Sequence, residues 1–125
     1  MKRSCIAIVD ALRARLYTYQ EDPTLQLDEV RDLVNLDHLD LQFAKDIVAE
    51  IDRIVREGSY GHVIVVASPR MLGDLRKVGS VLHRADLVLD EIPRDLAKLT
   101  SPQLHDRLAE LKLIPPRQRL SFAQR

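Results

Sequence analysis

The chain has 125 residues, of which 46% are hydrophobic and 30% are charged, a composition typical of one globular domain and not of a disordered chain. Its 19 basic and 19 acidic residues cancel, so the net charge favours neither nucleic acid nor an anionic membrane as a partner. The single cysteine excludes an internal disulfide and a cysteine-based zinc site.

The apolar runs are short compared with targeting and membrane segments. Roughly five apolar residues precede Asp10, fewer than a signal peptide needs, and no run approaches the ~20 residues of a membrane helix. The sequence therefore predicts a cytoplasmic protein without a membrane partner. Because Cys5 lies in the apolar run 5–9, we expect a buried and unreactive thiol.

The first quarter of the chain predicts three antiparallel strands. Residues 5–9 form a continuous apolar run, which fits a central strand buried on both faces. Residues 14–19 alternate between apolar and polar side chains, as a second strand does. A turn at residues 21–24 and apolar positions within 25–30 then indicate a third strand, so the chain opens as a meander.

The next segment predicts a helix followed by a buried strand. Apolar residues recur at spacings of three and four over residues 37–57, the pattern of an amphipathic helix. Asp37 or Asp40 can cap its start, and Gly58 is expected to end it at the C′ position. The apolar run 62–67 predicts a strand, and the helix before it implies a crossover to a parallel pair.

Two further helices and one strand complete the predicted elements. Ser68 and Pro69 are favoured at a helix start, and Gly79 is expected to end that second helix. Residues 87–92 predict a fifth strand, and residues 103–112 predict the last helix.

The domain organisation predicted from these elements is simple. Residues 1–114 form a single α/β domain, and residues 115–125 form a flexible basic tail whose three arginines have no acidic neighbour. That tail is either a solvated end or a contact to nucleic acid or a partner. A neutral chain with an edge meander is compatible with a homodimer, which no residue specifies.

The junction between the strand 62–67 and the following helix is the candidate ligand site. Free backbone N–H groups at a helix start attract anions, and ligands of open α/β sheets lie beyond the carboxyl ends of parallel strands. The residues of this candidate anion site are Ser68, Arg70, Arg76 and Lys77. The alternative is an ordinary helix start with solvated basic residues, because neither a P-loop nor a dinucleotide glycine motif is present.

The chain shows no other pattern with clear chemistry. A two-metal nuclease of the ribonuclease H type would use Asp10 and Glu50, but its third acidic position falls at residues 67–68, which have none. Asp10 is therefore expected as a turn or capping residue. The histidines form no i, i+3 or i+4 pair and no serine lies in a Gly-x-Ser-x-Gly elbow, so we predict no metal, no cofactor and no catalytic residue, and a structural role for His62.

Several segments together carry a family resemblance. They are Ala-Ile-Val-Asp at 7–10, Ala-Arg-Leu-Tyr at 14–17, Phe-Ala-Lys-Asp-Ile at 43–47, Val-Val-Ala-Ser-Pro-Arg-Met-Leu-Gly-Asp-Leu-Arg-Lys at 65–77 and Glu-Ile-Pro-Arg-Asp-Leu-Ala-Lys-Leu at 91–99. Over roughly residues 5–110 the chain resembles the bacterial host attachment protein family. That family is in turn similar to the middle domain of archaeal and eukaryotic peptide-chain release factors.

The resemblance implies a fold and limits the function. The implied fold is a three-layer, ribonuclease H-like α/β domain with a five-stranded mixed sheet, an antiparallel meander followed by parallel strands, and about three helices. Release factors hydrolyse peptidyl-tRNA through a Gly-Gly-Gln loop between the third strand and the long helix. The corresponding connection, residues 32–37, lacks this sequence, so peptide release is not implied.

Two functions from different classes remain open. The first is an uncharacterised, non-catalytic binding or adaptor protein of the host attachment family. The alternative is an RNA- or ribosome-associated, translation-related factor that lacks the peptide-release loop. The sequence identifies neither the partner nor the pathway.

Overall fold

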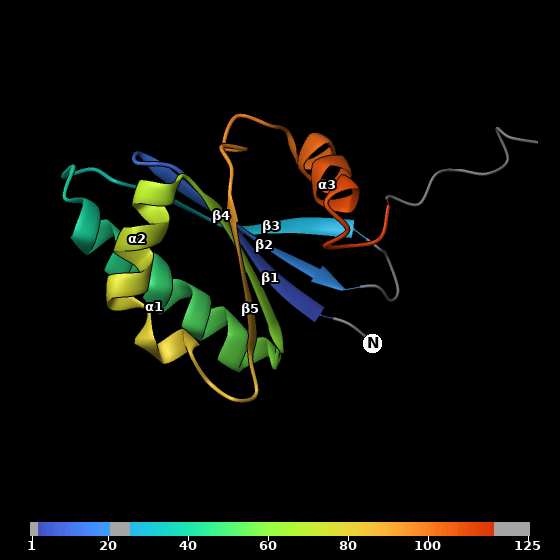
Figure 1. Ribbon diagram of the computed structural model, residues 1–125, viewed down its shortest axis with the longest axis horizontal. Helices are drawn as coiled ribbons and strands as arrows, with labels where there is room; N and C mark the ends of the chain where they lie inside the picture. Colours follow the sequence, from blue (N-terminus) through green and yellow to red (C-terminus); the bar gives the residue numbers. More distant parts are fainter. Residues whose placement is uncertain (1–2, 21–25, 117–125) are drawn as a thin grey trace, which may run out of the picture.

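The computed structural model describes residues 3–20 and 26–116 (Figure 1). Their regular elements, in chain order, are β1 (Arg3–Val9), β2 (Arg13–Gln20), β3 (Gln26–Val34), α1 (Asp40–Gly58), β4 (His62–Ala67), α2 (Pro69–Val78), a short 3-10 turn (Ser80–Leu82), β5 (Val88–Pro93) and α3 (Ser101–Glu110). Among these residues no helix is both long enough and apolar enough to cross a membrane.

The strands form one mixed sheet in the order β3-β2-β1-β4-β5. β1 pairs antiparallel with β2, and β2 pairs antiparallel with β3. β4 pairs in parallel with both β1 and β5. The predicted α/β class, with a five-stranded sheet that is antiparallel and then parallel and with three α-helices among the described residues, is confirmed, while the ribonuclease H-like assignment stays a prediction.

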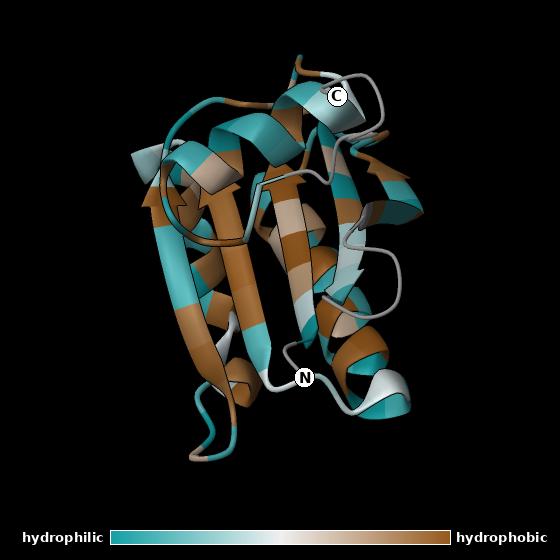
Figure 2. Cartoon of the chain, turned by 90° about the vertical axis from the view of Figure 1, so that its right-hand side faces the viewer, coloured by the Kyte–Doolittle hydropathy of each residue, from teal (hydrophilic) through white to brown (hydrophobic). Residues whose placement is uncertain are grey.

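Helices cover both faces of the sheet, as Figure 1 shows. Alternate residues of β1 point to opposite faces, so Cys5 and Ala7 pack toward α1 and α2, whereas Ile6 and Ile8 pack toward α3. Figure 2 shows the second face, with apolar residues along the central strands and the largely hydrophilic outer surface of α3 lying across them. The continuous apolar run 62–67 follows from this layering, because every residue of β4 is buried.

The start of α1 differs from the prediction. Leu39 occupies the N-cap position without a side-chain capping bond, so a cap from Asp37 or Asp40 is wrong. Asp40 is the first helical residue, and its carboxylate accepts a hydrogen bond from Asn35 Nδ2 at 3.2 Å. The buried Asn35 also donates to the carbonyl of Ala11 at 2.9 Å. The connection between β3 and α1 is thus held by the buried side-chain amide of Asn35 and not by a helix cap.

The end of α1 also differs in detail. Gly58 is the last helical residue, and Ser59 adopts the left-handed conformation with φ 56°. A Cβ at Gly58 would lie 2.3 Å from Cε2 of Tyr60. Gly58 therefore makes room for the ring of Tyr60. The chain turns at the next residue, Ser59.

The remaining elements lie close to their predicted positions. β3 extends to residue 34, beyond the predicted 25–30, and the register between β2 and β3 shifts at Leu16 and Tyr17. The predicted turn 21–24 and residues 117–125 of the predicted tail lie outside the described residues. At the start of that tail, Nε2 of His105 donates to the carbonyl of Pro115 at 2.9 Å, which holds this position on α3.

Candidate functional site

Ser68 lies at the junction of β4 and α2, as predicted. Its hydroxyl oxygen accepts a hydrogen bond from the backbone N–H of Met71 at 3.3 Å, and Pro69 follows as the first helical residue. The N-terminus of α2 therefore carries an internal cap, which satisfies one of the N–H groups that an anion would use.

The three basic residues of the predicted anion site do not converge. Arg76 is directed to β5, where its Nη2 lies 2.6 Å from Oε1 of Glu91, and this hydrogen bond raises the pKa of the guanidinium. Arg70 is 86% exposed and lies 3.7 Å from Asp40 at the start of α1. Lys77 is exposed near the end of α2. Ser68 and Arg70 both lie at the start of α2, Arg76 is paired with Glu91 instead, and anion binding at this position stays a prediction.

An exposed apolar surface lies beside Arg70, and sequence reasoning missed it. We call it the β3–α1 surface and define it by Leu12, Val34, Leu36 and Leu39, whose exposed fractions are 57%, 56%, 81% and 59%. Asn35 holds its two parts together, because its backbone N–H donates to the carbonyl of Leu12 at 2.8 Å. Large apolar side chains gathered at such exposure mark interaction surfaces on soluble proteins.

A small cavity lies within the β3–α1 surface. Its volume is about 190 Å³, and its lining includes Leu36, Leu39 and the buried ring of Phe43. Two carboxylates, of Asp37 and Asp46, also line it. The surface is thus apolar in its centre and acidic at its edge.

A chain of side-chain hydrogen bonds crosses three strands on the α3 side of the sheet. Ser4 Oγ lies 3.0 Å from Nδ1 of His62, and Nε2 of His62 lies 2.7 Å from Oδ2 of Asp90. A carboxylate can only accept, so Nε2 of His62 donates to Asp90, and Nδ1 on the other side of the ring faces the Ser4 hydroxyl. Ser4 has an exposed fraction of 0%, which prevents a substrate from reaching its oxygen. His62 therefore links β1 to β5 through side-chain hydrogen bonds, and its structural role stays a prediction.

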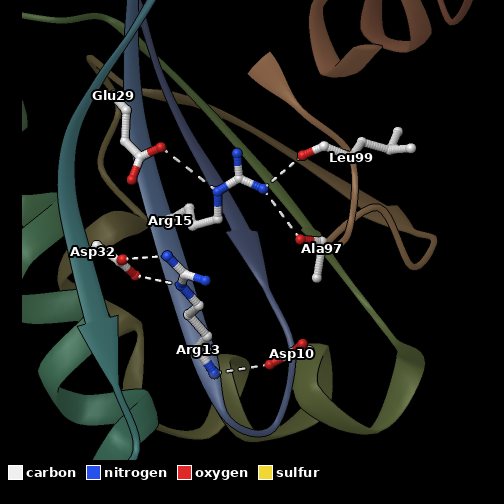
Figure 3. Close-up of polar contacts among 7 residues, drawn as sticks. All are labelled: Asp10, Arg13, Arg15, Glu29, Asp32, Ala97 and Leu99. Carbon is white, nitrogen blue, oxygen red and sulfur yellow. Dashed lines mark hydrogen bonds and ion pairs between the residues drawn. The ribbon is translucent and has the colours of Figure 1, made fainter. Parts of the chain in front are cut away.

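Two arginines of β2 organise the same face of the sheet (Figure 3). Nη1 of Arg15 donates to the carbonyls of Ala97 and Leu99 at 3.1 and 2.7 Å, and its Nε lies 3.6 Å from Glu29. Arg15 is only 13% exposed, so its guanidinium is a partly buried anchor for the segment that leads from β5 to α3. Arg13 binds the carboxylate of Asp32 on β3, with Nε at 2.7 Å.

The acidic residues considered for a nuclease have other roles. Oδ1 of Asp10 accepts from the backbone N–H groups of Leu12 and Arg13, both at 2.8 Å, which confirms Asp10 as a turn residue. Glu50 is bound by Arg53, and this contact lowers the pKa of its carboxyl, with a further contribution from Arg31. Within residues 3–20 and 26–116 no three acidic, histidine or cysteine side chains are placed to share a metal ion.

Cys5 is the free thiol of the chain, and it lies in the core between β1 and α1. Burial raises the pKa of Cys5 to about 12, and the negative charge of Glu50 adds to the increase. At neutral pH the thiol is therefore protonated, and a thiolate is not available as a nucleophile.

These observations describe a small α/β protein whose buried polar groups serve the fold and whose exposed apolar residues include the four of the β3–α1 surface. A family described as "Protein required for attachment to host cells" has a model that matches residues 35–108. The chain belongs to this host attachment family, as its sequence motifs predicted. Comparison with curated proteins gives no match.

Two solved structures show partial similarity. The archaeal translation termination factor aRF1 shares 14% identity and a TM-score of 0.46, over 98% of this chain and 41% of its own. The Aquifex aeolicus Ppx/GppA phosphatase, type II variant, shares 14% identity and a TM-score of 0.43, over 74% of this chain and 36% of its own. The chain spans about two fifths or less of the length of these structures.

Proposed function

We propose that the chain is a non-catalytic binding or adaptor protein of the host attachment family, which binds a protein partner through the β3–α1 surface. The observation that carries the proposal is the exposure of Leu36 and Leu39, at 81% and 59%, in a connection that Asn35 holds in a fixed shape. A preformed apolar surface loses little conformational freedom on binding.

The β3–α1 surface has one neighbour among the residues of the predicted anion site. Arg70 of α2 lies 3.7 Å from Asp40, the first residue of α1, so the start of α2 borders the β3–α1 surface. Arg70 supplies an exposed positive charge, and Asp37 and Asp46 supply negative charges at the cavity. Such charges at the rim favour specificity and a rapid encounter more than affinity.

The test is complementation of host-cell attachment in the organism that carries the gene. The double variant Leu36→Asp, Leu39→Asp is expected to lose attachment while it keeps its abundance and its stability within about 0.5 kcal/mol, because both side chains are exposed. The matched control is Val88→Asp on β5, which is 61% exposed at the other edge of the sheet and should complement.

Two results would contradict the proposal, and they differ in meaning. Normal attachment by the double variant would show that the surface is wrong. Normal attachment after deletion of the whole gene would show that the role inferred from the family is wrong.

An RNA- or ribosome-associated function remains the second candidate, and one observation favours it. Arg70 and Lys77 are seven residues apart, so they lie on the same face of α2, and both are exposed. The double variant Arg70→Ala, Lys77→Ala should then reduce co-sedimentation with ribosomes and lower the salt dependence of RNA binding. If the unmodified chain does not co-sediment at low salt, this function is excluded.

A further inference from the structure

A second cleft lies at the end of the sheet where β4 and β5 begin, beside the residues that precede these two strands. Its volume is about 470 Å³, within the range of pockets that hold small molecules. Its lining is rich in polar residues and consists of Val55, Arg56, Ser59, Tyr60, Gly61, Arg84 and Asp86. Residues 59–61 precede β4 and α2 follows it, so the cleft is separate from the β3–α1 surface.

Two guanidinium groups from distant parts of the chain meet at this cleft. Asp52 of α1 holds both, because its Oδ2 lies 2.8 Å from Nε of Arg56 and its Oδ1 lies 2.9 Å from Nη1 of Arg84. Arg84 is also 3.4 Å from Asp86. Asp52 therefore positions the two arginines relative to each other before any ligand arrives.

Most of the donors of these arginines remain available. Each guanidinium carries five N–H groups in a planar fork, the contact to Asp52 uses one nitrogen of each, and Nε of Arg84 also faces Asp86. Arg56 is 62% exposed and Arg84 is 26% exposed, so solvent and solutes reach both. Both arginines line the cleft and keep N–H groups that the contacts to Asp52 and Asp86 do not use.

The rest of the cleft adds positive charge and space. The Arg3 guanidinium lies 4.6 Å from the centre of the Tyr60 ring, so a third cation borders the lining. Arg3, Arg56 and Arg84 outnumber the carboxylates of Asp52 and Asp86 by one. Gly61 lines the cleft without a side chain, and a Cβ there would meet one atom at 3.9 Å, the carbonyl oxygen of Asp86.

We propose that this cleft binds a small phosphorylated molecule, with its phosphate group between Arg56 and Arg84. A phosphate monoester carries nearly two charges and three acceptor oxygens, so it can engage two guanidinium forks. A monocarboxylate has two oxygens, which one fork satisfies. The inference does not rest on the proposed function, since the two surfaces share no residue.

The experiment is a titration of the full chain with inorganic phosphate, ribose 5-phosphate and acetate at constant ionic strength, followed by amide chemical shifts. The phosphates are expected to cause saturable shifts at Ser59, Gly61, Arg84 and Asp86, with acetate at least tenfold weaker. Arg56→Gln and Arg84→Gln should each weaken phosphate binding about tenfold. The matched control is Arg53→Gln on the same helix, whose guanidinium contacts Glu50 and Glu57 and does not line the cleft.

Each outcome decides the proposal. Absence of saturable shifts at these amides in millimolar phosphate would overturn it, as would equal binding of acetate. An equal loss of binding in Arg53→Gln would show that phosphate responds only to the overall charge. Arg84 also links α1 to the segment before β5, so Arg84→Gln can fail to fold. In that case the phosphate affinity of Arg56→Gln, compared with that of the unmodified chain, decides the proposal.

Discussion

Burial decides the chemistry of individual residues in this protein. Ser4 and Cys5 are neighbours on β1, and both carry groups that are nucleophilic when exposed and activated. Both have an exposed fraction of 0%. The hydrogen bond between Ser4 and His62 therefore satisfies a buried hydroxyl, and the thiol of Cys5 is packed as a small apolar group.

The first prediction concerns Cys5. Because the pKa of this thiol is about 12, Cys5 should not react with iodoacetamide at pH 8 in the folded protein, and it should react fully in denaturant. Mass spectrometry measures the modified fraction. Rapid labelling of the native chain at a rate independent of unfolding would contradict the buried position.

A second prediction concerns Glu50 and has a defined sign. Arg53, and after it Arg31, lower the pKa of Glu50 in the folded chain below its ordinary value of 4.5. The stabilisation is therefore present above about pH 4.5 and disappears as the pH falls through the folded-state pKa. Glu50→Gln should be less stable than the parent chain at pH 7, and the difference in Tm should shrink as the pH falls below 4.5. A difference that stays constant over this range would exclude the linkage.

At the scale of elements, two glycines of the α2 region should respond in opposite directions to alanine. A Cβ at Gly79 would lie 2.6 Å from the carbonyl oxygen of Leu75, a backbone atom that cannot move away. A Cβ at Gly73, within α2, would meet nothing within 4 Å.

Gly79→Ala is thus expected to destabilise the fold by about 1–3 kcal/mol, as overpacking does. Gly73→Ala should stabilise it by about 0.5–1 kcal/mol through helix propensity. Urea unfolding measures both values under the same conditions. Stabilisation by both changes would show that Leu75 can shift and that the turn after α2 is not tightly packed.

Local signals predicted some elements fully and others in part. β4 and α2 have the predicted bounds, because a buried apolar run, a Ser-Pro start and a closing glycine all act within a few residues. β3 was predicted too short, because the register shift opposite Leu16 and Tyr17 interrupts its alternation after Glu29. The cap at the start of α1 was predicted incorrectly. Asn35 fixes this start by binding both Asp40 and Ala11, and Ala11 is 24 residues away in the sequence.

The candidate sites depended even more on contacts that the sequence does not show. The run from Leu33 to Leu39 contains four large aliphatic side chains among its other residues, and only the packing of α1 decides which of them are exposed. Arg56 and Arg84 lie 28 positions apart, and Asp52 brings them together. The predicted group of Ser68, Arg70, Arg76 and Lys77 lies along one helix and its N-cap, yet Glu91 on β5 binds Arg76.

At the scale of the whole molecule, the two candidate surfaces lie at opposite ends of the parallel strands. The β3–α1 surface borders the start of α2, which follows β4. The cleft lined by Arg56 and Arg84 lies where β4 begins. A partner on the first surface and a phosphorylated ligand in the second can therefore bind at the same time. Variants of one surface should leave binding at the other unchanged, which the two sets of substitutions above can verify.

The central position of β1 has a consequence for synthesis of the protein. β1 pairs with β2 across a short turn, but its other edge pairs with β4, and the partners Ser4 and His62 lie 58 residues apart. At ~5–20 residues per second, a ribosome takes roughly 3–12 s to make that interval. During this time the emerging meander presents an unpaired apolar strand edge, which is the state most exposed to aggregation and to chaperones.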